Sequence, residues 1–416
     1  MMEKINQQPL PMVIIVNAIS TGALLAEELY RAFQLIHIES SASVKANDNP
    51  CFQRDKFSQF FTWYDDDEEA IIDELRAMRP VAIIPGNGAA VELSDLLASR
   101  LSLRGNSPRT THLRQDKYAM NQAASQHGLL TAAQHISNHP SELKRWYLHQ
   151  GFIRAVIKPL NGAGSGDVYL CETAGQVEQA AQLIIGKYHR TQVRNHAALV
   201  QKFIEGPEYR VNTVSFEGQR WTTDIWKVHK RFRQGRNLYD YDELCNPQHP
   251  DASACLSYTL QVLTAIDIVT GAGHTRLILS PEGPQLLKTV AHASDAANPQ
   301  AIRLATGADQ LMLMRYAYTA PEKLTSIPPV YPFRKHLRCV HAIASVIRPF
   351  SRCKLQAFLL QLESFFSVVM KSAEGAVLKP TVDVASCPAA FFLASDHPQQ
   401  IEHDYQLYRL WETDNL

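Results

Sequence analysis

A lysine and a glycine-rich stretch stand together in the middle of the chain. Lys158 ends an apolar run that begins at residue 155, and residues 159–167 (Pro-Leu-Asn-Gly-Ala-Gly-Ser-Gly-Asp) lead to a second short apolar run at 168–170. This pattern predicts two antiparallel strands joined by a flexible loop. The backbone N–H groups of such a loop and a lysine ammonium can surround the oxygens of a polyphosphate. A surface hairpin without a ligand is the alternative, and the loop alone leaves it open.

Further segments occur in a fixed order around this loop. Residues 85–88 (Pro-Gly-Asn-Gly) and 116–118 (Asp-Lys-Tyr) precede it, while residues 200–208 (Val-Gln-Lys-Phe-Ile-Glu-Gly-Pro-Glu) and 211–218 (Val-Asn-Thr-Val-Ser-Phe-Glu-Gly) follow it. With these segments the chain resembles the ATP-grasp superfamily, in particular its carboxylate-amine ligases of the L-amino acid ligase type. The resemblance runs along most of the chain, and several ordered matches are more specific than any single one.

The resemblance implies two α+β subdomains that hold ATP between them. It assigns the phosphates to Lys117, Lys158, Gly164, Ser165 and Gly166, the adenine to Gln201, Lys202, Phe203 and Ile204, and the ribose to Glu208. A lysine ammonium is a compact partner for phosphate, and an apolar strand such as 203–204 can offer a purine both a surface and edge amides. Without the motif, Lys117 would be interpreted as a solvated helix residue.

Residues 271–292 match the segment in which members of the family hold their magnesium ions. They typically use a glutamate on one strand and then a glutamate and an asparagine on the next, because hard cations need hard oxygen ligands. Here Arg276 and Lys288 replace the two glutamates, Val290 replaces the asparagine, and His292 replaces an arginine that often follows. The comparison predicts no metal site of the usual kind and ATP binding with little dependence on Mg²⁺.

No catalytic residue is assigned by these patterns, and Arg276 and Lys288 are the candidates. Two cations can neutralise a triphosphate directly. The alternative is that both are exposed strand residues in surface ion pairs. His274 shares a strand face with Arg276 by period-two alternation and is expected to be a hydrogen-bonded histidine. Glu282, within Pro-Glu-Gly-Pro, is expected at a hairpin turn and not on a metal.

Alternating strand and helix signals predict how these residues are positioned. Apolar runs alternate with helical patterns over the first hundred or so residues, which is typical of a doubly wound α/β domain with parallel strands. Strands are also expected at 198–203 and 208–216, paired with each other. The expected division is an α/β domain at 1–108, an ATP-grasp subdomain with the glycine hairpin at 109–197, a second with the adenine linker and the altered metal segment at 198–320, and a small C-terminal α+β region at 321–416.

Charge and composition exclude several other classes of protein. Lys plus Arg and Asp plus Glu each total 41, so the formal charge is zero and nothing draws the chain generally to nucleic acid or to an anionic membrane. Residues 226–233 (Trp-Lys-Val-His-Lys-Arg-Phe-Arg) could suggest RNA binding, but the resemblance puts them beside an acceptor substrate, where cations suit a carboxylate. The polar N-terminus and the short apolar runs predict neither a signal peptide nor a membrane span. Seven scattered cysteines favour the cytoplasm.

We therefore predict an ATP-dependent ligase that joins a carboxylate, activated as an acyl phosphate, to an amine such as an amino acid. The alternative is a catalytically degenerate ATP-grasp protein that binds nucleotide or a partner protein without ligation. The altered metal positions favour this alternative, whereas the glycine loop, Lys117 and Lys158 favour the ligase. The expected partners are a small carboxylic acid and an amine or amino acid, with no nucleic acid or membrane; a homo-oligomer or a partner protein is left open.

Overall fold

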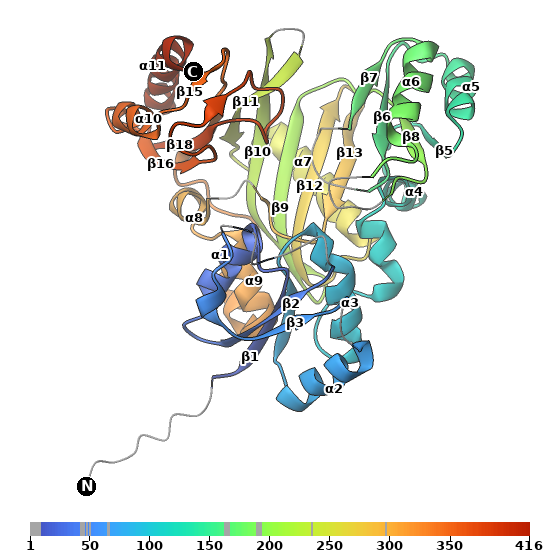
Figure 1. The fold of residues 1–416 in the computed structure, drawn as a ribbon, viewed down its shortest axis with the longest axis vertical. Coiled ribbons are helices and arrows are strands. Elements are labelled where there is room, and N and C mark those ends of the chain that lie inside the picture. Colours follow the sequence, from blue (N-terminus) through green and yellow to red (C-terminus); the bar gives the residue numbers. More distant parts are fainter. Residues whose placement is uncertain are drawn as a thin grey trace.

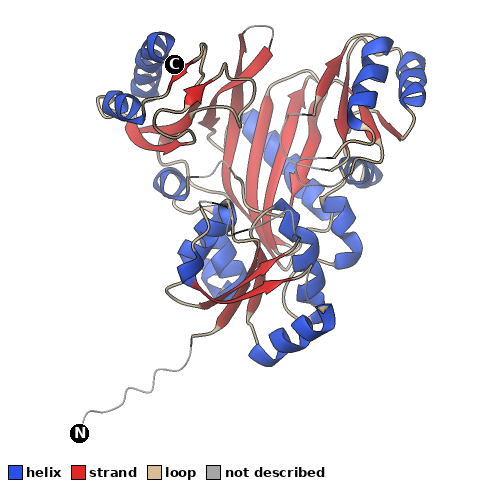
Figure 2. Ribbon diagram, in the orientation of Figure 1, coloured by secondary structure: helices blue, strands red, loops and turns tan. Residues whose placement is uncertain are grey.

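The computed structural model describes residues 10–41, 46, 49, 51–64, 67–161, 167–188, 194–233, 236–295 and 298–416. Within these ranges the chain forms two four-stranded sheets, one eight-stranded sheet and a two-stranded ribbon of β15 (Arg348–Pro349) and β17 (Val377–Leu378). The ribbon views place the N-terminal sheet below the large sheet and the second four-stranded sheet beside one edge of the large sheet (Figures 1 and 2). No helix among the described residues is long and apolar enough to cross a membrane.

The N-terminal sheet is parallel and carries helices on both faces. Its strand order is β3-β2-β1-β4, and the strands are β1 (Met12–Val16), β2 (Gln34–Glu39), β3 (Phe57–Thr62) and β4 (Ala82–Pro85). Alternate side chains of a strand point to opposite faces. Val13 and Ile15 accordingly share a core with α1 (Thr21–Leu29), whereas Ile14 and Val16 share one with α2 (Glu68–Met78) and α3 (Val91–Arg100). The predicted doubly wound arrangement is confirmed.

A second, antiparallel sheet carries the glycine hairpin. Its order is β5-β8-β6-β7, with β5 (Gln134–Ser137), β6 (Ala155–Pro159), β7 (Tyr169–Cys171) and β8 (Ala198–Lys202). The pairing of Ile157 with Tyr169 confirms the predicted strand-loop-strand hairpin. The helices of this part are α4 (Lys117–Gln126), α5 (Pro140–Gln150) and α6 (Ala174–Ile184). Apolar side chains of α5 and α6 pack on the sheet in one core.

The eight-stranded sheet is the centre of the molecule, and all its neighbouring strands are antiparallel. In spatial order it contains β13 (Gly283–Val290), β12 (Gly271–Ser280), β9 (Glu208–Phe216), β10 (Gln219–Arg233), β11 (Arg236–Leu244), β14 (His336–His341), β18 (Ala389–Ser395) and β16 (Phe365–Met370). The remaining helices are α7 (Pro250–Ala265), α8 (Pro299–Thr306), α9 (Gln310–Thr319), α10 (Arg352–Leu359) and α11 (Pro398–Asn415). Short 3₁₀ helices occupy Arg54–Lys56, Gly88–Ala90, Pro108–Arg114 and Pro321–Ser326.

One expected pairing is wrong. Strand β8 pairs with β5 and β6, whereas β9 pairs with β10 and β12, so the two strands belong to different sheets. The linker between them carries the chain from one sheet to the other. Gly206 in this linker has φ +140°, and a Cβ there would collide with the backbone of Leu279 in β12. Glycine therefore permits the close passage that separates the two strands.

Candidate functional site

Lys117 and Lys158 lie at the base of the glycine hairpin. Asp116 caps α4 by accepting from the backbone N–H groups of Tyr118 and Ala119, which makes Lys117 the first residue of that helix. The Lys117 ammonium donates to the carbonyls of Pro159 (3.2 Å) and Leu160 (3.0 Å), just where the hairpin loop begins. The helix is thereby joined to the start of the loop.

Lys158 is buried in β6, with 6% of its surface exposed. Its ammonium donates to Oε1 of Gln201 on the neighbouring strand β8 at 2.7 Å. The amide is neutral, so this bond satisfies one ammonium proton without matching the charge. Two of the residues predicted for the phosphates are therefore next to the loop, while Gly164, Ser165 and Gly166 lie outside the described residues.

Arg276 and Lys288 stand opposite each other on β12 and β13. They are cross-strand partners in the ladder of these antiparallel strands, and a register shift follows Arg276. Directly opposed residues have neighbouring side chains, although like charges at such positions repel. Lys288 has neither a hydrogen bond nor an ion pair with any other described residue. The expectation that both are exposed residues in surface ion pairs fails, because Arg276 is half-buried in an internal ion pair.

Glu208 is the partner of Arg276. Its Oε1 accepts from Nε (2.9 Å) and Nη2 (2.6 Å) of Arg276, and its Oε2 accepts from the Lys230 ammonium at 2.7 Å. Arg276 also donates to the hydroxyl of Tyr239 at 2.6 Å. Burial alone would raise the pKa of Glu208, but the charges of Arg276 and Lys230 outweigh it and lower the pKa to about 2. One carboxylate thus serves two cations.

Lys117, Lys158, Arg276 and Lys288 form what we call the cation cluster. Burial lowers the pKa of Lys117 from 10.5 to about 7, and the charges of Lys158 and Lys288 add to this. Burial and the charges of Arg276 and Lys288 lower the pKa of Lys158 to about 8. Burial and Arg276 lower the pKa of Lys288 to about 8. Four cations from α4, β6, β12 and β13 therefore act on one another, which is the electrostatic pattern of an anion site.

The linker residues differ in what they offer. Gln201 is buried, and its Nε2 has no hydrogen-bond partner among the described residues. The backbone N–H groups of Lys202 and Phe203 already donate to Ala133 and Arg154, so the expected free edge amide is not found at Phe203. The Lys202 side chain is exposed. Ile204 packs with Ala132 and Ile278, next to Leu287, in a small apolar cluster at the β12–β13 edge.

The remaining sequence candidates are accounted for by local contacts. Nδ1 of His274 lies 2.7 Å from Oδ1 of Asn212, which confirms a hydrogen-bonded histidine. Glu282 sits in the turn between β12 and β13, where its Oε2 accepts from the Ser280 hydroxyl at 2.8 Å. In the basic run on β10, Lys230 bonds to Glu208, and Arg231 lies 3.2 Å from Asp240. Carboxylates thus already match much of the positive charge that could have suggested RNA.

The cation cluster does not fit a magnesium ion. The guanidinium of Arg276 and the ammonium of Lys288 are donors without a free lone pair, and Val290 is a hydrocarbon. Both oxygens of Glu208 already accept from cations. Mg²⁺ needs oxygen ligands in an octahedron and is repelled by like charge. The fit to a polyphosphate is good, because its oxygens can accept from every lysine of the cluster.

A second buried charged region lies further along the large sheet, and we call it the paired network. Arg210 Nη1 lies 2.6 Å from Asp242 Oδ2, and Nε2 of His341 lies 3.2 Å from the same oxygen. Arg409 of α11 donates to Glu412 at 2.6 Å and to Asp240 at 2.5 Å. Burial would raise the pKa of Asp242, but Arg210 and His341 lower it to about 2. The charges of this network are matched within the protein.

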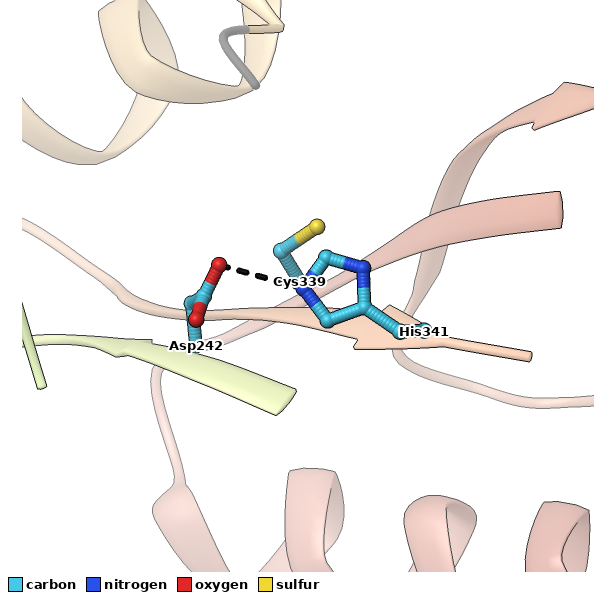
Figure 3. Close-up of side chains that lie close together, drawn as sticks. All are labelled: Asp242, Cys339 and His341. Atoms are coloured by element: carbon cyan, nitrogen blue, oxygen red, sulfur yellow. Dashed lines mark hydrogen bonds and ion pairs between the residues drawn. The ribbon is translucent and has the colours of Figure 1, made fainter. Parts of the chain in front are cut away.

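Figure 3 shows Asp242, Cys339 and His341 of this region close together. Their potential ligand atoms lie within 4.8 Å of one another. Burial, however, raises the pKa of the Cys339 thiol and so keeps it protonated, and Arg210 already neutralises Asp242. A metal needs a deprotonated thiolate and an available carboxylate. The group is therefore better described as part of the ion-pair network.

Sequence reasoning missed the role of Arg210, Tyr239 and Lys230 around Glu208. Period-two alternation was the available signal, since Glu208 and Arg210 are two apart on one strand and must share a face. The partners on β10 and β11 carry no such signal. Lys230 bonds to Glu208 and Tyr239 accepts from Arg276, and both contacts depend on which strands are neighbours, which is a property of the folded sheet.

Comparisons with known proteins agree with this architecture. No protein-family model matches the chain. Dapdiamide A synthase of Enterobacter agglomerans is 26% identical over 355 residues, which are 84% of each protein. The crystal structure of an L-amino acid ligase from Bacillus licheniformis matches 98% of both chains with a TM-score of 0.74 and 16% identity. The chain has the ATP-grasp fold.

A third relative strengthens this assignment. A carboxyaminoimidazole ribonucleotide synthase from Aspergillus clavatus, solved with ATP, has the ATP-grasp fold with a TM-score of 0.71 at 13% identity, over 98% of this chain and 99% of its own. The resemblance inferred from the residues is confirmed at the level of the fold. The residues of the cation cluster come from two parts of this fold, the part with α4 and the four-stranded sheet of the glycine hairpin and the β12–β13 edge of the large sheet. Figure 1 shows these two parts side by side.

Proposed function

We propose that this protein is an ATP-dependent ligase that joins a carboxylate to an amine, such as an amino acid. The observation that carries the proposal is the cation cluster beside the glycine hairpin of an ATP-grasp fold, in which Lys158 and Lys288 have no carboxylate bonded to them among the described residues. Buried cations in excess of anions favour an anionic ligand. The relative named as a dapdiamide synthase and the structure named as an amino acid ligase support the same class of reaction.

In this proposal the nucleotide lies along the cluster. Lys117 and Lys158 bind phosphate oxygens together with the loop residues Gly164, Ser165 and Gly166. Residues 201–204 bind the adenine, where the unpartnered Nε2 of Gln201 offers a donor to a purine nitrogen. Glu208 lies beside the ribose, since its Oε2 accepts, among the described residues, only from Lys230 and keeps a second lone pair for a hydroxyl.

The reaction follows from this placement. A carboxylate oxygen of the acid substrate attacks the γ-phosphorus, and ADP leaves. The amine nitrogen then attacks the acyl carbon, phosphate leaves, and the nitrogen loses a proton. The cluster, with Arg276 and Lys288 as the candidate catalytic residues, stabilises negative charge on the phosphoryl oxygens during both steps.

The domain division at 1–108, 109–197, 198–320 and 321–416 and a cytoplasmic location belong to the same proposal. The acid and the amine would meet beside the cluster. A cation-lined site suits a carboxylate substrate as well as a phosphate.

The test is amine-dependent release of ADP from ATP by the full chain, measured over panels of amino acids and small carboxylic acids. We expect at least one acid and amine pair to raise the rate above the ATP-only background, and Lys158→Ala to abolish that increase. ATP binding without turnover on any pair would favour the alternative, a nucleotide-binding protein without ligation. This alternative is supported by Arg276 and Lys288, which stand where the family typically has carboxylates.

A further inference from the structure

The charges of the cation cluster are not balanced within the protein. Glu208 is the carboxylate bonded to Arg276, and it is shared with Lys230. Lys158 donates to a neutral amide, and Lys288 has no hydrogen bond or ion pair with the described residues. The acids that raise the pKa of Lys288 are Asp295, which lies exposed beyond β13, and Glu208, which is already bonded to Arg276 and Lys230. The cluster therefore keeps unmatched positive charge.

Adding a divalent cation would increase this imbalance. A metal at the β12–β13 edge would face the Arg276 guanidinium and the Lys288 ammonium across the ladder, and neither can coordinate it. The charges that a metal would bring to a triphosphate are already present on these two side chains. Arginine and lysine side chains can supply positive charge and hydrogen bonds to a phosphate together.

Building on the nucleotide binding proposed above, we propose that the cluster binds the triphosphate as a metal-free anion. Lys288 and Arg276 take the charge-neutralising place of the divalent ion, and Glu208 and Tyr239 hold the Arg276 guanidinium in position. The ligand class is a nucleoside triphosphate without its magnesium.

Binding of this kind is coupled to proton uptake. Lys158 and Lys288 have pKa values lowered to about 8, and that of Lys117 is lowered to about 7, so near these pH values the free protein holds part of these amines neutral. A bound polyanion favours the charged ammonium and raises each pKa. Metal-free ATP should therefore bring protons into the site when it binds.

The experiment is isothermal titration calorimetry of the full chain with ATP at pH 8, once with excess EDTA and once with excess Mg²⁺. Each titration is repeated in two buffers of different ionisation enthalpy, which measures the protons taken up. We expect dissociation constants in the two conditions within about threefold of each other, and net proton uptake in EDTA. Lys288→Gln should weaken binding in EDTA by about tenfold or more and reduce the uptake.

A matched control is Lys144→Gln, because Lys144 is a lysine of α5 that pairs with Glu178 on the surface. It should leave ATP affinity in EDTA unchanged. The triple variant Arg276→Glu, Lys288→Glu, Val290→Asn adds an oxygen-ligand set and should bind ATP only with Mg²⁺. Lys288→Gln is the decisive variant, since it adds no acid beside Glu208 and disturbs the fold least.

The outcomes separate the inference from the proposed function. ATP binding that requires Mg²⁺ in the parent would overturn the inference and leave nucleotide binding intact. Absence of ATP binding in both conditions would overturn both. Equal binding in both conditions with no effect of Lys288→Gln would overturn the role given to the β12–β13 cations.

Discussion

The cation cluster and the paired network both bury charge, but they treat it in opposite ways. In the paired network Arg210 meets Asp242, and Arg409 meets both Asp240 and Glu412. In the cation cluster Lys158 and Lys288 meet no carboxylate among the described residues. Removing an ion from water costs several kcal/mol unless it is well paired. In the paired network, ion pairs within the protein offset this desolvation cost. In the cation cluster the cost is not offset by bonded carboxylates among the described residues, so an anionic ligand would lower it.

The comparison also separates two uses of the same sheet. The paired network links β9, β11 and β14 to α11, so it holds the C-terminal region on the sheet. The cluster links the β12–β13 edge to α4 and β6 of the other sheet. Matched buried charge here connects parts of the fold, whereas unmatched buried charge favours an anionic ligand.

Breaking the paired network should give the largest effect. Asp242→Asn removes the anion that compensates Arg210 and leaves a buried guanidinium unmatched. The free energy of unfolding should fall by about 3–5 kcal/mol, as for other broken buried pairs. Chemical denaturation followed by circular dichroism measures the loss.

A surface pair provides the control for this change. Asp396→Asn removes an exposed carboxylate bonded to Lys335 and should cost less than about 1 kcal/mol. Equal losses in the two variants would show that the paired network does not hold parts of the fold together.

Removing a cluster lysine should affect binding and spare the fold. Lys158→Ala takes away a charge-assisted phosphate contact, which should weaken ATP by about 1.5–3 kcal/mol, roughly tenfold or more. Without nucleotide, the free energy of unfolding of the variant should fall by no more than the contribution of the one hydrogen bond from Lys158 to Gln201. Calorimetry for ATP and urea denaturation for stability separate the two quantities, with Lys144→Ala as the matched surface lysine. Unchanged ATP affinity would remove Lys158 from the site.

The third comparison is the dependence of stability on pH, which rises with pH in both regions but in separate pH windows and for different reasons. Folded-state pKa values of about 7 for Lys117 and about 8 for Lys158 and Lys288 lie below the ordinary 10.5. Between these values the unfolded chain binds more protons, so stability from the cluster rises with pH. Asp242, with its pKa lowered from 3.8 to about 2, contributes stability that is lost as the pH falls through that range.

Urea denaturation of the nucleotide-free protein at a series of pH values measures both windows. Lys288→Gln should flatten the rise at alkaline pH and leave the acid limb in place. A parent whose stability falls steadily above pH 8 would contradict the assignment of unmatched lysines to the cluster.

Local signals predicted much of the fold, and each has an identifiable physical basis. The apolar runs at β1, β2 and β4 and the periodicity of α2 and α3 predicted the parallel sheet. The edge strand β3 and the short β5 were missed, because their residues are mixed and half-buried and show no clear period. The predicted pairing of β8 with β9 was wrong because the sequence of an apolar strand does not specify which strand lies beside it.

The sequence by itself determined which residue types occupy the site. Lys158 before a glycine-rich loop was readable from order and spacing, and Arg276 and Lys288 were singled out by the family resemblance. Their position as cross-strand partners on β12 and β13 came from the structure. Only the tertiary structure decided which charges are matched. Glu208 reaches Arg276 across 68 residues, and Asp240 reaches Arg409 across 169. The order of strands in the sheet brings such pairs together. No local pattern predicts this order, because the chain contains many acidic and basic residues and only the packing of distant strands selects which of them become neighbours.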